Sequence, residues 1–268
     1  MPSYVVTGSS RGLGLGFVQA ISNDPTNAVF AVVRSKSSAS QLLDFVAKHS
    51  HKNVHIIEAN NKDAHALQNA ADIVSKITGG TLDILINNSA LMAHERGGLT
   101  LDAFPSPEIL EDDLVLYFRT NAVGPIHTIN AFLPLLLAGN TKKCIAISTT
   151  LGSPKVTNAA DFGNYAGYGI SKAALNLAIA KYACRFRDQG LLFLSINPGL
   201  VKTAQGPKEQ VEAFYESRNK INREKNPDFE GAITVERSVG DILAFIDKAT
   251  IADSGKFVHR DGRDGDSF

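Results

Sequence analysis

A tyrosine and a lysine four residues apart, Tyr168 and Lys172, are the pair whose types and spacing best suit chemistry. They lie in the run NYAGYGISKAALNLAIAKYA, which predicts a helix, so both side chains share one helix face. A phenol has an ordinary pKa of about 10 and is a poor acid at neutral pH, but a neighbouring ammonium lowers that pKa. The pair could therefore supply a general acid, although the same spacing also occurs on ordinary helix surfaces.

The elements that must position this pair alternate along the chain. Short apolar runs predict strands at residues 4–6, 28–33, 54–57, 82–86, 144–148, 191–196 and 256–259. Helical spacing follows most of them, at residues 13–21, 41–49, 64–77, 165–187 and 235–248. A further helical stretch from 106 to 137 begins with Ser106-Pro107-Glu108, typical of an N-cap followed by proline, and is expected to break near Asn121. The polar segment 203–230 predicts one weak helix, and the ending RDGRDGDSF is expected to be loose.

Strands that alternate with helices form parallel sheets covered on both faces. The chain shows no composition break, linker or repeat. We therefore expect an α/β fold, a doubly wound parallel sheet (a Rossmann fold), as a single domain over residues 1–268. The ligand of such a sheet lies at the carboxyl ends of the strands, near the point where the strand order reverses.

A glycine-rich turn follows the first predicted strand and precedes the first predicted helix. A helix N-terminus offers unpaired N–H groups and a partial positive charge, and glycine lets the backbone approach a pyrophosphate closely. The turn therefore predicts a dinucleotide site. The cofactor-binding residues expected here are Gly8, Ser10, Arg11, Gly12, Leu13 and Gly14.

The residues after the second strand bear on which dinucleotide binds. An enzyme that prefers NAD usually places an acid here, on the ribose 2′-hydroxyl, whereas this chain has Arg34, with Arg11 inside the glycine turn. These cations would attract a 2′-phosphate that an acid would repel. NADP(H) is therefore favoured over NAD(H), although Arg34 could also be a solvated loop residue.

Composition and charge exclude several classes of protein. Lys + Arg and Asp + Glu both total 27, and no basic run is interleaved with aromatic residues, so no nucleic-acid partner is expected. The seven histidines lack metal-ligand spacing, so no metal is expected. The chain shows no signal peptide and no apolar run long enough to span a membrane, and Cys144 and Cys184 lie in apolar settings. We expect a cytoplasmic protein with reduced thiols.

Several motifs together resemble the short-chain dehydrogenase/reductase family along almost the whole chain. They are Thr7-Gly8-x-x-x-Gly12-x-Gly14, Asn87-Asn88-Ser89-Ala90, Asn121, Ile147-Ser148-Thr149, Tyr168-x-x-x-Lys172 and Asn197-Pro198-Gly199-x-Val201-x-Thr203. The N-terminus and the SGKFV…DG ending are similar to those of C-factor-type carbonyl reductases and fungal ketoreductases. The resemblance implies an NADP(H)-dependent reductase of a small carbonyl substrate, assembled as a homodimer or homotetramer.

The resemblance also implies a role for each matching residue. Tyr168 would exchange the proton with the reacting oxygen, Lys172 would lower the pKa of that phenol and bind the nicotinamide ribose, and Asn121 would hold a water in a proton relay. Hydride would pass between C4 of the nicotinamide and the carbonyl carbon. The further cofactor-binding residues that the motifs imply are Asn60, Asn88, Ser89, Pro198, Gly199, Val201 and Thr203.

Three departures from the family pattern qualify these roles. Thr149 stands where the family has its catalytic serine; we assign it that role, and expect Ser148 to point to the opposite side of the strand. Several additional residues precede Tyr168, so the segment 153–164 is expected to form a wall of the substrate site. Asn60 replaces the aspartate that the family usually places near the adenine, which weakens that contact.

The loops at the strand ends are expected to set substrate specificity. They are mostly apolar or aromatic, which suits a lipophilic ketone or aldehyde, for example a polyketide. Two other functions remain open: a non-redox enzyme that dehydrates or cyclises its substrate, and a protein that senses NADP(H). An intact set of Asn121, Tyr168 and Lys172 argues against the sensor. The candidate substrate residues are Leu91, Met92, Leu151, Pro154, Phe162, Tyr165, Leu200 and the segment 204–226.

Overall fold

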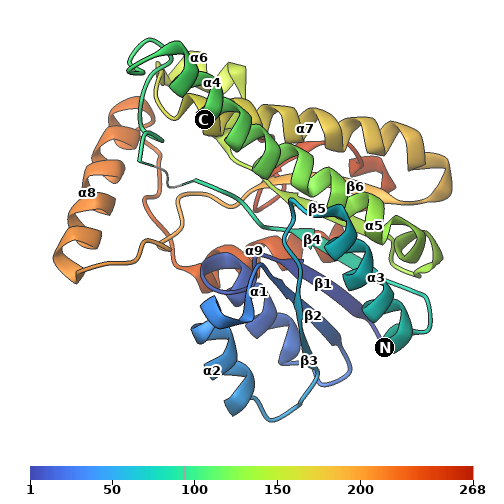
Figure 1. Ribbon diagram of the computed structural model, residues 1–268. Coiled ribbons are helices and arrows are strands. Elements are labelled where there is room, and N and C mark those ends of the chain that lie inside the picture. Colours follow the sequence, from blue (N-terminus) through green and yellow to red (C-terminus); the bar gives the residue numbers. More distant parts are fainter. Residues whose placement is uncertain (93–94, 268) are drawn as a thin grey trace.

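Seven parallel strands form one sheet in the order β3, β2, β1, β4, β5, β6, β7 (Figure 1). The computed structural model describes residues 1–92 and 95–267. The strand order reverses between β1 and β4, which confirms the doubly wound fold expected from the sequence. The strands are β1 (Ser3–Thr7), β2 (Ala28–Val33), β3 (Val54–Glu58), β4 (Ile84–Asn87), β5 (Lys143–Ile147), β6 (Leu192–Asn197) and β7 (Phe257–His259).

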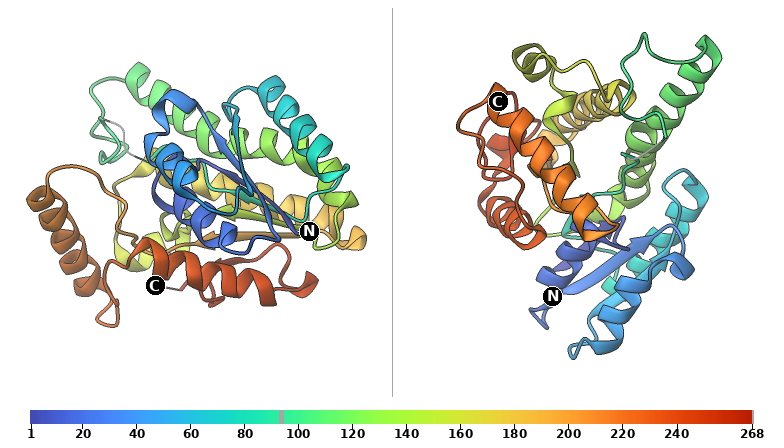
Figure 2. Two further views of the ribbon diagram at one scale, coloured as in Figure 1. Left: turned by 90° about the horizontal axis from the view of Figure 1, so that it is seen from below. Right: turned by 90° about the vertical axis from the view of Figure 1, so that its left-hand side faces the viewer.

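Helices cover both faces of this sheet (Figures 1 and 2). Helices α1, α2 and α9 contribute to the core on one face, and α3, α5 and α7 to the core on the other. Helix α4 packs alongside α7. The helices are α1 (Gly12–Ser22), α2 (Ser40–Lys48), α3 (Ala64–Thr78), α4 (Pro107–Phe118), α5 (Gly124–Ala138), α6 (Pro154–Ala160), α7 (Ala166–Phe186), α8 (Lys208–Lys225) and α9 (Val235–Lys248).

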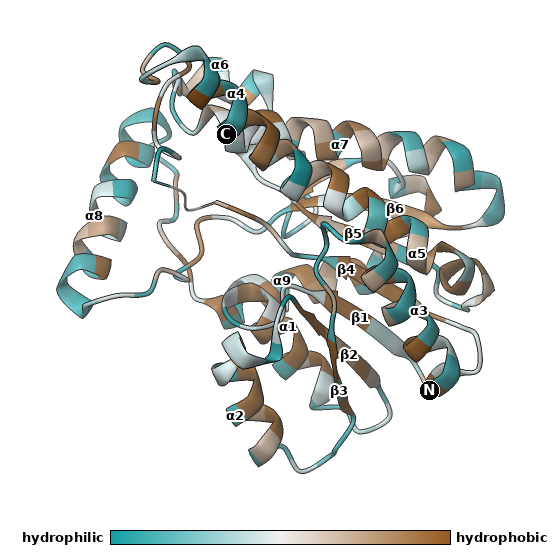
Figure 3. Ribbon diagram, in the orientation of Figure 1, coloured by the Kyte–Doolittle hydropathy of each residue, from teal (hydrophilic) through white to brown (hydrophobic). Residues whose placement is uncertain are grey.

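Strand β2 shows why an uninterrupted apolar run becomes a central strand. All of its residues are buried; Phe30 and Val32 join the core under α3 and α5, while Val29 and Ala31 join the core under α1 and α9. Successive side chains point to opposite faces, so a strand covered on both sides must be apolar at every position. Figure 3 shows the hydrophobic strands enclosed by helices of mixed hydropathy.

The helical stretch that leads from α4 into α5 differs from the expectation of a break near Asn121. Ser106 caps α4, accepting a bond from Ile109 N at 3.4 Å, and Pro107 occupies the first turn, as the sequence predicts. The chain then continues without interruption through a π-helical segment, Arg119–Val123, into α5. A π segment adds a residue to the turn and frequently occurs at functional sites, so it displaces Asn121 from regular helix geometry without ending the helix.

The continuous helix from Pro107 to Ala138, 32 residues long, is apolar enough by length and composition to cross a membrane. The expectation that no apolar run reaches this length was therefore wrong by that measure. In the most apolar 18-residue window of this helix, 56% of the window is buried inside the protein. Ile129 and Phe132 of α5 belong to the core on the face of the sheet that α3, α5 and α7 cover. The core helix of a globular domain passes the same test.

The end of the chain is folded, contrary to the expectation of a loose tail; only Phe268 lies outside the described residues there. An antiparallel bridge joins Val258 to Asp264. Arg260 is buried, and its guanidinium pairs with Asp241 of α9 at 2.9 Å and with Glu230. Arg260 thus ties the tail to α9 and to the segment before it, through contacts between distant segments that local composition does not reveal.

Helix α8 lies beyond the carboxyl ends of the strands, apart from the helices that cover the sheet (Figures 1 and 2). It is the helix expected in the segment 203–230, and it is 18 residues long. Its buried Tyr215 holds it to the preceding loop: the hydroxyl accepts from Ala204 N at 2.8 Å and donates to Val201 O at 3.1 Å. The fold thus places α8 over the edge of the sheet where a ligand is expected.

Candidate functional site

The turn after β1 is tied to the turn after β4, its neighbour in the sheet. The hydroxyl of Thr7 accepts from the backbone N–H groups of Asn88 and Ser89, both at 3.1 Å. The Asn88 side chain donates back to the carbonyl oxygens of Thr7 at 3.1 Å and of Gly8 at 3.2 Å. These bonds hold the two strand ends at the switch point in one fixed arrangement.

The glycines of the first turn are required by close backbone contacts. Gly8 has a φ of +68°, and a Cβ built there would lie 2.9 Å from Ser89 Cα. A Cβ on Gly14 would lie 2.2 Å from Gly8 O and 2.6 Å from the Asn88 amide nitrogen. Gly12, at φ +58°, would bring a Cβ to 3.4 Å from a methyl of Thr203. The turn is therefore a cradle that side chains would fill, as a phosphate-binding turn requires.

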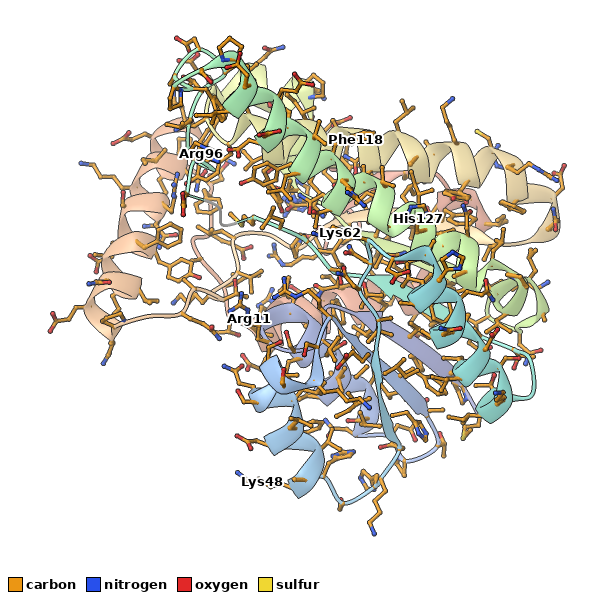
Figure 4. The ribbon with its side chains drawn as sticks, viewed as in Figure 1. Arg11, Lys48, Lys62, Arg96, Phe118 and His127 are labelled. Atoms are coloured by element: carbon orange, nitrogen blue, oxygen red, sulfur yellow. The ribbon has the colours of Figure 1, made fainter. Side chains whose placement is uncertain are left out.

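The helix that follows this turn can receive an anion. In the described structure no side chain caps the N-terminus of α1, so its first N–H groups keep their capacity to donate. Ser10 and Leu13 are half-buried beside the glycines. Arg11 is exposed, and its guanidinium donates to Gln205 Oε1 at 2.9 Å; Figure 4 shows it where α1 starts. The structure thus joins Arg11 to the loop before α8, and among the described residues Arg11 makes no hydrogen bond with Arg34.

The ends of β2 and β3 form the next part of the site. Arg34 is exposed, and the described residues give it no ion pair. The backbone N–H of Lys36 donates to Glu58 Oε2 at 2.7 Å. Sequence reasoning missed this acid because it belongs to the neighbouring strand, where Glu58 pairs with Val33. The amide oxygen of Asn60 accepts from Lys62 N at 3.1 Å, so this side chain stabilises a local turn.

Lys172 is buried at the carboxyl end of β5, with a relative exposure of 2%. Its Nζ donates to Ile147 O at 2.6 Å and lies 5.9 Å from the centre of the Tyr168 ring. Burial lowers the pKa of Lys172 to about 7, because a desolvated ammonium is costly. The lysine can therefore exchange a proton near neutral pH.

The pKa of Tyr168 departs from the expectation of a phenol activated by a neighbouring ammonium. Burial raises it above its ordinary value, with a smaller contribution in the same direction from Tyr117. The Lys172 ammonium is not among the causes of this shift. The expected lowering of the Tyr168 pKa was therefore wrong for the protein alone: desolvation outweighs a lysine that loses its own charge near neutral pH. The phenol is held in its protonated form.

Asn121, on the π segment, connects two sides of the site. Its side chain is buried and donates to Leu91 O at 2.8 Å and to Ser171 Oγ at 3.0 Å, while its Oδ1 accepts from Leu91 N at 2.7 Å. Ser171 in turn donates to Tyr168 O at 2.7 Å. Asn121 thus fixes the loop after β4 against the helix that carries Tyr168.

The two hydroxyl residues after β5 have different partners. Ser148 is buried and donates to Asn176 Oδ1 at 2.6 Å, on α7. Thr149 is half-buried, and its hydroxyl accepts from Leu151 N at 3.3 Å, where it caps a short helical turn, Thr150–Gly152. Ser148 is therefore engaged in packing α7 onto the sheet, and Thr149 keeps its hydroxyl proton available to donate.

The loop after β6 closes the other side of the glycine turn. Pro198 is buried and its carbonyl accepts from Ser238 Oγ at 2.8 Å; Gly199 has a φ of +82°. Val201 is buried and forms a parallel bridge with Ile233, and Thr203 meets Gly12. The structure therefore brings residues 198–203 to the same place as the first turn, although they are far away in sequence.

The outer wall beside Tyr165 combines Tyr117, which sequence reasoning did not assign to the site, with Phe214 and Arg218 of the predicted substrate segment 204–226. Tyr117 is buried against Gly167, where a Cβ would lie 2.7 Å from its ring, and donates to Met92 O at 3.2 Å. Arg218 of α8 donates to the Tyr165 hydroxyl, and its guanidinium also contacts the Phe214 ring. Phe214 and Arg218, four residues apart, share one face of α8. No pattern in the sequence singled out Tyr117.

Residues 153–164, the remaining predicted wall, contain the short helix α6. Ser153 caps the start of this helix, and Asp161, in the left-handed region, caps its end. Phe162 is half-buried and Pro154 is exposed. Within residues 1–92 and 95–267 no group of His, Cys, Asp and Glu could hold a metal ion.

Comparison with known proteins places this arrangement in context. The family model described as short chain dehydrogenase matches residues 3–212. The chain is 38% identical to short chain dehydrogenase virK of Hypocrea virens, over 98% of each chain, and 40% identical to short-chain dehydrogenase/reductase AacuF of Aspergillus aculeatus, over 96% of this chain and 97% of that one. Among solved structures it is similar to carbonyl reductase Sniffer of D. melanogaster, with a TM-score of 0.78, and to an NADPH-bound carbonyl reductase from chicken fatty liver, with a TM-score of 0.77; each is 27% identical over 98% of both chains.

Proposed function

Because the chain belongs to the short-chain dehydrogenase/reductase family, we propose that it is an NADP(H)-dependent carbonyl reductase that converts a lipophilic ketone or aldehyde into an alcohol. The observation that carries this proposal is the buried pair of Tyr168 and Lys172 at the carboxyl end of β5. The likeness to carbonyl reductases at 27% identity supports reduction of a carbonyl group over other chemistry of the family.

The residues present fit a dinucleotide. The Gly8–Gly14 turn would hold the pyrophosphate against the first N–H groups of α1, because no Cβ fits there. Asn88 and Ser89 border this turn, and Pro198, Gly199, Val201 and Thr203 would line the nicotinamide end. Asn60 would lie near the adenine. Exposed Arg34 and Arg11 are the groups that favour a 2′-phosphate, and with it NADP(H) over NAD(H).

When bound, the reduced nicotinamide supplies the hydride. Tyr168 is the general acid: its raised pKa keeps the phenolic proton on Oη, ready for the carbonyl oxygen. Lys172, whose pKa is about 7, can return a proton toward Tyr168 and would bind the nicotinamide ribose. Thr149 would donate a hydrogen bond to the same oxygen. Asn121, which bonds to Ser171 of α7, would hold a water of the proton relay.

Assembly and location follow the family pattern in this proposal. Apolar side chains are exposed on two adjacent helices, Val115 and Phe118 on α4 and Ile170 and Leu177 on α7. A patch of this kind is typical of a contact between subunits. We place the protein in the cytoplasm as a homodimer or homotetramer joined through these helices.

A panel of aromatic and aliphatic ketones with NADPH or NADH tests the proposal, with loss of the absorbance of the reduced nicotinamide as the measurement. We expect reduction of at least one lipophilic ketone, faster with NADPH, and no reduction by Tyr168→Phe. Binding of NADPH without oxidation across the panel would favour a non-redox enzyme on the same fold. Failure to bind either dinucleotide would contradict the cofactor assignment itself.

A further inference from the structure

One arginine near the site differs from the other shielded arginines of the described residues. Arg96 is partly buried and pairs with Asp113 at 2.9 Å, and buried Arg260 pairs with Asp241 at 2.9 Å. Arg218 is also partly buried, but no carboxylate among the described residues pairs with it. A shielded cation without a counter-charge carries a desolvation cost that an anionic ligand would remove.

The surroundings of Arg218 are aromatic. Its Cζ lies 5.0 Å from the centre of the Tyr165 ring and 5.4 Å from that of Phe214, and it donates to the Tyr165 hydroxyl. Ring faces attract a guanidinium but do not neutralise its charge. The stacked guanidinium therefore has a fixed plane while part of its donor fork stays available.

Arg218 meets the reacting end of the site through Tyr165. Tyr165 immediately precedes α7, the helix of Tyr168, and holds a left-handed backbone with φ 57°. Such strain in a residue other than glycine is often kept where a side chain must point in a required direction. Burial is the main cause of the raised pKa of Tyr117, to which Tyr165 also contributes, and of that of Tyr168, to which Tyr117 also contributes.

We propose that Arg218 is the substrate-recognition residue of this reductase and pairs with a carboxylate on an aromatic ketone. The inference rests on the proposed function. A guanidinium fork matches a carboxylate in a bidentate manner, and the flanking rings of Tyr165 and Phe214 suit a flat aromatic body. The carboxylate would lie under α8 while the ketone oxygen reaches Tyr168.

Calorimetric titration tests this inference without turnover. 4-Acetylbenzoate and its methyl ester are titrated into the enzyme saturated with NADP⁺, which cannot reduce them. We expect the acid to bind about tenfold to a hundredfold more tightly than the ester, as a charge-assisted pair provides. Arg218→Gln should abolish that preference, and Arg218→Lys should retain part of it. Exposed Lys220→Gln, on the same helix, removes an equal charge and should leave the preference intact.

Every other result overturns the inference. Equal binding of acid and ester by the unmodified protein, or no binding of either, would show that the site does not select a carboxylate. A preference that survives in Arg218→Gln would place the recognition elsewhere. Equal weakening of acid and ester in Arg218→Gln would mean that Arg218 only latches α8 onto Tyr165.

Oxidation of NADPH with the same two ketones separates this inference from the proposed function. Reduction of both ketones with equal kcat/KM would support the proposed reductase function and contradict selection of a carboxylate. Arg218-dependent binding of the acid with no reduction of either ketone would keep the recognition residue and contradict the reductase.

Discussion

Replacing Lys172 with methionine should stabilise the cofactor-free protein at neutral pH while it impairs the enzyme. The pKa of this buried lysine is lowered from 10.5 to about 7, so folding disfavours its charged form. Between pH 7 and pH 10.5 the lysine is protonated in the unfolded chain but not in the folded protein. The free-energy cost that this lysine adds to folding is therefore largest at and below pH 7. This cost falls as the pH rises toward 10.5, the pKa of the lysine in the unfolded chain. Methionine has no such penalty at any pH.

The magnitude follows from the same shift. One pKa unit corresponds to about 1.4 kcal/mol. Raising the pH from about 7 to about 9 should therefore increase the free energy of unfolding of the wild type by about 2 kcal/mol. The free energy of unfolding of Lys172→Met, relative to wild type, should therefore decline by about 2 kcal/mol between these pH values. Loss of the bond from Nζ to Ile147 O subtracts about 1 kcal/mol from the mutant at both.

Urea denaturation of both proteins without cofactor, at the two pH values, measures this difference. Lys181→Met, an exposed lysine on the same helix, is the matched control and should change stability by less than about 0.5 kcal/mol at either pH. A stability difference for Lys172→Met that does not change with pH would refute the reasoning, because the lysine would then be charged in the folded protein. The dissociation constant for NADPH, measured on the same samples, should rise in Lys172→Met.

Three further outcomes are expected. Arg34→Asp should weaken NADPH binding by about tenfold to a hundredfold and improve NADH binding, measured by fluorescence titration; tighter binding of NADH by the wild type would contradict the cofactor assignment. Thr149→Val should lose most of its kcat while Thr149→Ser keeps it and Ser148→Ala changes it less; the opposite ranking would transfer the role to Ser148. Tyr168→Phe should bind NADPH normally and reduce ketones about 10²–10⁴-fold more slowly, and a rate near that of wild type would exclude it as the acid.

The sequence by itself determined the elements and the spacing of the reactive pair. The predicted strand at 28–33 coincides with β2, and the Ser-Pro-Glu signal placed the start of α4 correctly. The Gly8–Gly14 turn lies between β1 and α1 as predicted. These features depend on backbone preferences and on side-chain periodicity within one segment, which neighbouring residues carry.

Only the tertiary structure decided what surrounds those residues. The pKa of Tyr168 rises because many distant segments exclude water from it, and its helix partner Lys172 loses its charge near neutral pH for the same reason. The contact of Arg218 with Tyr165 joins α8 to the residue before α7, and that of Arg11 with Gln205 joins residues still farther apart. Desolvation and contacts of this kind depend on the packed arrangement of the whole chain, so no local pattern in the sequence encodes them.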